Sequence, residues 1–146
     1  CGIQLYTFPE AQSAIFLNLK KAMNWDFTND SHIEVIDSVT IQGYRFSDGW
    51  ARDQHIYFRT RFSKPFEKIE LDTMAIVKEN KRIGTATIAR FDFNTQEGEH
   101  ILVSTAISGV SPGRLMSDPL SPGLLSALSA TCLFLASKLG HHIGWL

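Results

Sequence analysis

The strongest constraint on the fold is an alternation of side-chain character between His55 and Phe62. One set of alternate positions is mainly apolar: Ile56, Phe58, Thr60 and Phe62. The other set is polar or amphipathic: His55, Tyr57, Arg59 and Arg61. Successive side chains of a strand point to opposite faces, so this period of two predicts an antiparallel sheet with one buried and one wetter face.

Further strand signals recur along the chain to about residue 110. They cover residues 2–8, 14–19, 33–35, 39–41, 68–78, 85–93 and 100–107. For residues 14–19 a helix is the alternative, because so short an apolar run does not reveal its period. Residues 24–31 are polar apart from Trp25 and Phe27 and predict a loop. Seven or eight strands joined by turns, without alternating helices, predict an all-β fold, an antiparallel β-sandwich.

The composition is that of one folded globular domain and excludes several kinds of partner. A net charge of −1 over 146 residues gives no basic surface for nucleic acid or an anionic membrane. Two cysteines, Cys1 and Cys132, indicate neither a disulfide framework nor a zinc site. A lipidated Cys1 would be followed by a flexible tether, whereas a strand follows at once. We therefore expect that the chain begins inside a domain.

The character of the chain changes after Ser111. From Pro112 to Leu146 the only charged residues are Arg114, Asp118 and Lys138. Leu124 to Leu139 predicts an apolar helix that ends at Gly140. This segment is short and polar for a membrane span, and we expect it to pack as an ordinary helix. The sequence thus divides into a sandwich at residues 1–111 and a divergent tail at residues 112–146.

Several local motifs occur in a fixed order along the sandwich segment. They are Tyr6–Pro9, Phe16–Leu19, Gly43–Ser47 with Gly49–Ala51, Phe62–Phe66, Phe91–Asn94 and Ile101–Val103. Their order and spacing resemble the N-terminal β-sandwich domain of glycoside hydrolase family 92, a family of calcium-dependent exo-acting α-mannosidases. The resemblance runs from Cys1 to about Ser111 and stops where the composition changes, which suggests a truncated or frame-shifted form of a longer gene.

The resemblance implies a function for the longer protein. It would be an inverting α-mannosidase that removes terminal α-linked mannose from glycans, exported by a bacterium to the periplasm or cell surface. Its calcium ion and its catalytic (α/α) barrel would lie outside this chain. The present piece would be a non-catalytic supporting domain, inactive alone, whose packing partner is the missing catalytic domain. A stand-alone carbohydrate-binding β-sandwich module is the alternative.

The residues themselves offer no catalytic or metal-binding set. An inverting glycosidase needs two carboxyl groups roughly 6.5–9.5 Å apart. Asp48 with Asp53, and Glu97 with Glu99, are candidate pairs, but both lie in predicted turns, where solvated carboxylates are ordinary. His141 and His142 are adjacent, so they point apart, and no acidic partner is near. We therefore assign no catalytic, cofactor-binding or metal-binding residue to this chain.

Aromatic residues near the central motif have two interpretations. Trp50, Tyr44 and Trp25 offer ring faces on which a sugar can stack. Alternatively, Tyr44 and Trp50 fill the core of the sandwich or its interface with the missing domain. We expect the second arrangement, with Arg45 and Arg52 as surface or interface charges rather than ligands.

Overall fold

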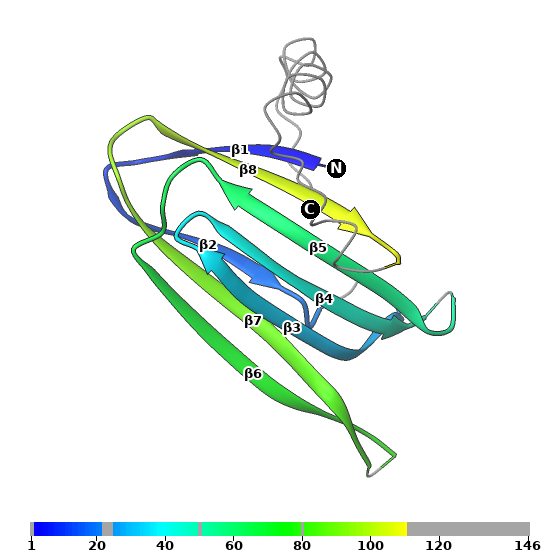
Figure 1. The fold of residues 1–146 in the computed structure, drawn as a ribbon. Coiled ribbons are helices and arrows are strands. Elements are labelled where there is room, and N and C mark those ends of the chain that lie inside the picture. Colours follow the sequence, from blue (N-terminus) through cyan, green and yellow to red (C-terminus); the bar gives the residue numbers. More distant parts are fainter. Residues whose placement is uncertain (1, 22–24, 50, 80, 111–146) are drawn as a thin grey trace. The chain divides into compact units, whose positions relative to one another are not determined.

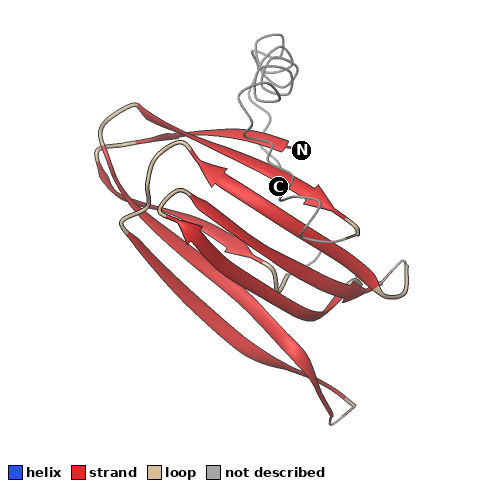
Figure 2. Cartoon of the chain, in the orientation of Figure 1, coloured by secondary structure: helices blue, strands red, loops and turns tan. Residues whose placement is uncertain are grey.

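The computed structural model describes residues 2–21, 25–49, 51–79 and 81–110, all within the first of two compact units, Cys1–Leu115. The predicted helix at Leu124–Leu139, together with Trp50, His141 and His142, lies outside the described residues. All regular structure in the described part is β-strand (Figure 2), and no helix there could span a membrane. The strands are β1 (Gly2–Phe8), β2 (Ala11–Asn18), β3 (Phe27–Asp37), β4 (Thr40–Asp48), β5 (Gln54–Phe62), β6 (Lys68–Lys78), β7 (Lys81–Thr95) and β8 (Glu99–Ser108).

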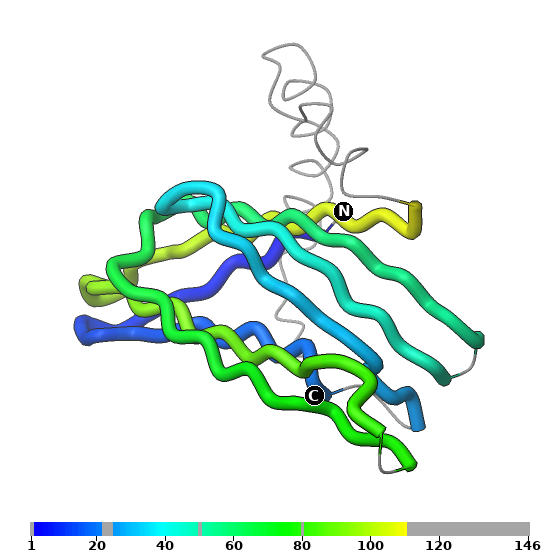
Figure 3. Tube along the Cα trace, turned by 60° about the horizontal axis from the view of Figure 1, so that its bottom comes forward, coloured from blue at the N-terminus to red at the C-terminus, as the bar shows by residue number. Residues whose placement is uncertain are grey.

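The eight strands form two antiparallel sheets, as Figure 1 shows. The larger sheet has the order β1-β8-β5-β4-β3, and the smaller one has the order β2-β7-β6. The tube in Figure 3 shows the two layers facing each other. The antiparallel β-sandwich predicted from the alternation at His55–Phe62 is therefore confirmed for the described residues.

The core lies between the two sheets and is built from alternate residues of both. The fully buried apolar side chains with no measurable exposure are Ile41, Ala89, Phe91, Phe93 and Ile101. The ring of Phe62 on the larger sheet lies 5.1 Å from that of Phe91 and 5.6 Å from that of Phe93 on the smaller sheet. Burying a phenylalanine ring contributes roughly 2–3 kcal/mol, so these contacts are a main source of the adhesion between the layers.

Residues 14–19, where helix was the alternative, belong to strand β2 as far as Asn18. The strand pairs with β7 from Ala11 opposite Thr95 to Asn18 opposite Ile88. At its first end Ser13 Oγ and Thr95 Oγ1 lie 2.8 Å apart inside the sandwich. The ladder to β7 satisfies the backbone groups along one side of this run, and Ile15 and Leu17 pack against the core. This pairing selects the strand over the helix.

The predicted loop at residues 24–31 is wrong from Phe27 onward, where β3 begins. Two of its polar side chains, the buried Ser31 and the half-buried Asp30, bond across to β7: Ser31 Oγ accepts the N–H of Thr87 at 2.9 Å. Asp30 Oδ1 accepts the N–H of Thr85 at 3.1 Å. The two backbones approach so closely that a Cβ on Gly84 would lie 1.7 Å from the carbonyl oxygen of Asn29. Hydrogen bonding here replaces the apolar packing that a sequence pattern detects.

Candidate functional site

The central motif Gly43–Ser47 lies on β4, and its residues alternate between the two faces of the larger sheet. Gly43 pairs with the buried Phe58, so Gly43, Arg45 and Ser47 face the interior. The intervening residues, Tyr44 and Phe46, face outward. The motif therefore contributes to two separate structures, one inside the sandwich and one on its outer face.

The inward part centres on Arg45, whose side chain is only 14 % exposed. Its Nε donates to the carbonyl oxygen of Leu19 at 3.1 Å and to Thr28 Oγ1 at 3.0 Å. Its Nη1 donates to Asp26 Oδ2 at 3.2 Å and to Ser47 Oγ at 3.0 Å. Arg45 thus joins the segment after β2 to β3 and β4. Of the expected surface or interface position of Arg45, the surface position is wrong, because the side chain is nearly buried among partners from segments that only the fold brings together.

Gly43 is required by close packing rather than by an unusual backbone angle. A Cβ at this position would lie 2.0 Å from the carbonyl oxygen of His32 and 2.8 Å from the ring of Phe58. Both distances are far below van der Waals contact, so only glycine fits where β3, β4 and β5 meet. The inward residues of the motif are therefore accounted for by packing and hydrogen bonding.

On the outer face, five rings from three strands form what we call the outer aromatic patch: His32, Tyr44, Phe46, His55 and Tyr57. The rings of Tyr44 and Phe46 stack with centroids 4.4 Å apart. The ring of Tyr57 meets that of Phe46 edge-on at 5.6 Å. Tyr44 therefore lies outside the sandwich core, so the core position we considered for it is wrong.

Tyr44 is held in this patch by a hydrogen bond. Its hydroxyl donates to Asp30 Oδ2 at 3.1 Å. Burial, and then the negative charge of Asp30, raise the pKa of the Tyr44 hydroxyl, so it remains protonated at neutral pH. Trp25, on the segment before β3, is 60 % exposed and makes no ring contact with the outer aromatic patch among the described residues. Of the three aromatic residues considered for sugar stacking, Trp50 lies outside the described residues.

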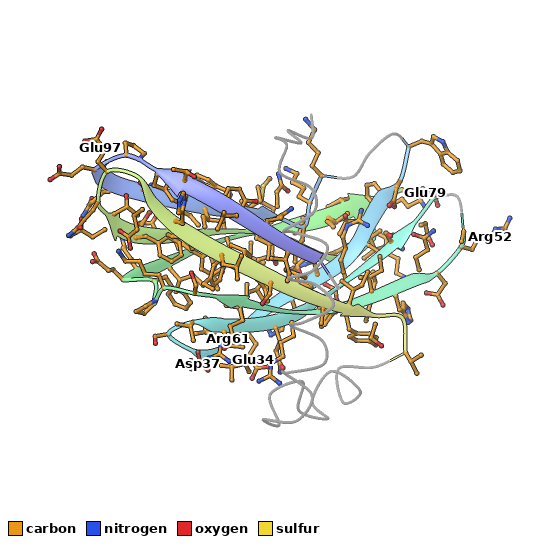
Figure 4. All side chains as sticks on the ribbon, turned by 90° about the horizontal axis from the view of Figure 1, so that it is seen from above. Glu34, Asp37, Arg52, Arg61, Glu79 and Glu97 are labelled. Atoms are coloured by element: carbon orange, nitrogen blue, oxygen red, sulfur yellow. The ribbon has the colours of Figure 1, made fainter. Side chains whose placement is uncertain are left out.

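The first candidate carboxyl pair lies in the loop between β4 and β5. Asp48 Oδ1 accepts the N–H of Asp53 at 2.9 Å, which lowers the pKa of Asp48, with a second contribution from the side chain of Asn29. Asp53 has a positive φ of 58° and its carboxylate lies 3.0 Å from His55 Nε2. Arg52 is exposed at the tip of this loop (Figure 4). Asp48 and Asp53 thus lie at the predicted turn, where Asp48 ends β4 and is half-buried and Asp53 is exposed.

The second candidate pair separates at the turn between β7 and β8. Glu97 is exposed at the end of the molecule opposite Arg52 and Glu79 (Figure 4). Glu99 instead begins β8, and its carboxylate lies 2.7 Å from Lys64 Nζ. The pKa of Glu99 is lowered mainly by the hydrogen bond from Lys64 and next by the bond from the N–H of Gln96. The predicted solvated turn describes Glu97 but not Glu99, whose partner lies 35 positions away.

The carboxyl groups whose pKa clearly shifts, among the described residues, all shift in one direction. A general acid needs a raised pKa to remain protonated near neutral pH. The carboxyl groups with a clear shift all have a lowered pKa: Asp37, Asp48, Glu70 and Glu99. Within the same residues, no group of three or more histidine, cysteine or acidic side chains could hold a metal ion.

Comparisons with known proteins identify the family of the chain. The model of the glycosyl hydrolase family 92 N-terminal domain matches residues 1–108. No curated protein matches the sequence significantly. Among solved structures, the family GH92 α-mannosidase BT3965 from Bacteroides thetaiotaomicron is similar, with a TM-score of 0.69 and 26 % identity over 93 % of this chain and 20 % of that chain.

Two further solved structures are similar over the same 93 % of this chain. BT3965 in complex with mannoimidazole has a TM-score of 0.68 and 26 % identity, and 19 % of its chain is covered. The GH92 inverting mannosidase BT2199 from Bacteroides thetaiotaomicron VPI-5482 has a TM-score of 0.61 and 17 % identity, with 19 % coverage, and supports the fold alone. The chain spans about a fifth of the length of these structures. It belongs to glycosyl hydrolase family 92 and represents part of that family's N-terminal domain.

Proposed function

We propose that this chain is a fragment of an inverting α-mannosidase that removes terminal α-linked mannose from glycans. Its role there is to support the catalytic domain without contributing catalytic groups. The family assignment and the likeness to a mannosidase solved with mannoimidazole support the activity of the longer protein. The coverage of only about a fifth of that chain supports a partial role for this one.

The supporting role is inferred from the packing and hydrogen bonding of the central motif. Gly43 fits a site closed to any side chain, and Arg45 is bonded to four partners inside the sandwich. The fold thus accounts for Gly43 and for the bonded nitrogens of Arg45, while Arg45 Nη2 and Asp26 Oδ1 are buried without a hydrogen-bond partner among the described residues. Among the described residues, the carboxyl groups whose pKa clearly shifts have a lowered pKa, which favours their ionised form. These properties suit a scaffold rather than an acid–base centre.

The outer aromatic patch is the surface that would contact the rest of the mannosidase. Five rings on the outer face of one sheet form an amphipathic area of the kind that marks protein interfaces. The faces of Tyr44 and Phe46 cover each other, which leaves ring edges directed outward. Ring edges suit packing against another polypeptide better than stacking on a sugar.

The calcium ion expected of the longer enzyme requires six to eight oxygen ligands. Among the described residues no group of three acidic, histidine or cysteine side chains comes together. We propose that the calcium ligands lie in other parts of the enzyme. For its location we propose the periplasm or the cell surface of a bacterium, as in the mannosidases that the sequence resembles.

Activity measurements on the purified chain test this proposal. Incubation with an aryl α-mannoside, with and without calcium, should release no mannose, whereas the BT3965 enzyme assayed in parallel should. A graft that replaces the matching segment of BT3965 by residues 1–108 should retain hydrolysis. Turnover by the chain alone, or a folded graft without activity, would contradict the supporting role.

A stand-alone carbohydrate-binding module is the second candidate, and the outer aromatic patch is the observation that favours it. Calorimetric titration of the chain with mannose oligosaccharides separates the two functions. A support domain gives no heat of binding. A binding module gives a saturable signal that Tyr57→Ala in the patch weakens and Phe16→Ala, exposed on the other sheet, leaves unchanged.

A further inference from the structure

Strand β6 is an open edge of the smaller sheet. It pairs with β7 along one side, and no strand among the described residues pairs with its other side. The strand is eleven residues long, about twice the usual length. In an antiparallel strand alternate residues direct both backbone groups away from the existing partner, so about five residues of β6 offer free N–H and C=O groups.

The protections that usually block an edge are weak on β6. Proline is absent from the strand, and its lysines, Lys68 and Lys78, lie only at the two ends. The irregularity beside Ile76 leaves β6 continuous, because the extra residue, Ile83, belongs to β7. By contrast β3, the long edge of the larger sheet, has two register shifts.

Exposed apolar side chains accompany the free backbone groups on β6. Leu71 is 49 % exposed, Met74 is 43 % exposed and Val77 is 60 % exposed. The seven-residue edge strand β1 has two large exposed side chains, Leu5 and Tyr6. Since β6 is longer than β1 and exposes apolar groups on both of its faces, it is well suited to accept another strand.

We propose that β6 pairs antiparallel with β6 of a second copy of this chain, so that two three-stranded sheets become one continuous sheet. The argument rests on the charge pattern of the strand. Residues directly opposite each other in a continuous sheet must lie on the same face of it. Because side chains alternate between the faces, the registers allowed for a two-fold pairing follow one another in steps of two residues. The register of full overlap places Lys68 opposite Lys78 twice, and like charges there are destabilising.

The next register removes this repulsion and replaces it with attraction. It places Glu70 opposite Lys78 and Leu71 opposite Val77, each of them twice, and Met74 opposite Met74 on the two-fold axis. Glu70 is exposed and in its own chain contacts the exposed Lys68 and Arg90, so it is accessible to a partner. Opposite charges and apolar pairs directly across a ladder are both favourable. This pairing does not depend on the mannosidase assignment.

A charge reversal and its rescue, both made in the 146-residue chain, test this register. Sedimentation equilibrium over the micromolar range should show dimers of the parent protein. Glu70→Lys should raise the dissociation constant by about tenfold, because it creates two like-charge pairs. The double variant Glu70→Lys with Lys78→Glu should restore the parent value. A monomeric parent with native strand content by circular dichroism, or a double variant as weak as Glu70→Lys, would overturn the proposal.

Disulfide trapping gives a second test that does not depend on charge. In a Cys1→Ser, Cys132→Ser background, Met74→Cys should form a covalent dimer under mild oxidation. Asp72→Cys is the matched control, since the two Asp72 positions would lie four residues apart along the ladder, about 13 Å, beyond disulfide reach. Equal trapping of both variants, or trapping of Asp72→Cys alone, would refute this register.

Discussion

Replacement of Gly84 by alanine should destabilise the protein severely, although the same change is often stabilising elsewhere. Gly84 lies where β7 passes β3, and its φ is not in the left-handed region. An alanine there would ordinarily stabilise by roughly 0.4–1 kcal/mol through the unfolded state. Here the new Cβ would lie 1.7 Å from the carbonyl oxygen of Asn29 and 2.7 Å from its carbonyl carbon. Both clashes are with backbone, which no side-chain rotation relieves.

The magnitude follows from what must move. Restoring van der Waals contact requires β3 and β7 to separate by about 1.5 Å, since carbon and oxygen normally approach no closer than about 3.2 Å. That separation breaks bonds that now measure 3.1 Å (Thr85 N to Asp30 Oδ1), 2.9 Å (Thr85 Oγ1 to Asp30 Oδ1) and 2.9 Å (Thr87 N to Ser31 Oγ). At about 1 kcal/mol each, their loss lowers the free energy of unfolding by roughly 3 kcal/mol.

Urea unfolding followed by tryptophan fluorescence measures this loss. The matched control is Gly109→Ala, whose Cβ would meet only the carbonyl oxygen of His55, at an ordinary 3.8 Å. The control should stay within about 0.5 kcal/mol of the parent protein. If Gly84→Ala also stayed within that range, the close crossing of β3 and β7 would not exist as described.

Two further changes test other parts of the sandwich. Arg45→Met should lower the free energy of unfolding by about 3 kcal/mol, because it leaves the Asp26 carboxylate without its donor. The exposed Arg52→Met should have no effect in the same urea titration. The pKa of Glu99 is lowered in the folded state, so its stabilisation is present above the ordinary value of 4.5 and is lost as pH falls through the lower folded value. The melting temperature of Glu99→Gln should therefore change less with pH below 4.5 than that of the parent protein, and parallel curves would exclude the Lys64 contact.

The fold was predictable where apolar residues alternate and not where polar residues replace them. Strand β5 follows from its pattern, since Phe58, Thr60 and Phe62 are buried on one face. The start of β3 shows no such pattern, because Thr28 and Ser31 are buried by hydrogen bonds to distant segments. Such bonds depend on which strands cross, and a single sequence does not contain that information.

The residues of the candidate site divide in the same way. The turn role of Asp48 and Asp53 follows from nearby residues and was predicted. The burial of Arg45 was not, because its partners include a backbone carbonyl 26 positions away. Tyr44 was assigned to the core or to an interface, and only the pairing of β4 with β3 and β5 shows that it faces outward.

The position of β8 has a consequence for how the protein acquires its structure during synthesis. The larger sheet places β8 between β1 and β5, with Gly2 opposite Thr105. Among the described strands β1 is therefore translated first, and its partner β8 is translated last. Pairings between residues so distant in sequence form slowly, and unpaired strands are then open to association with other chains. Of the described strands, β1 waits longest for the partner that it has here, so a chaperone would have most effect on this strand.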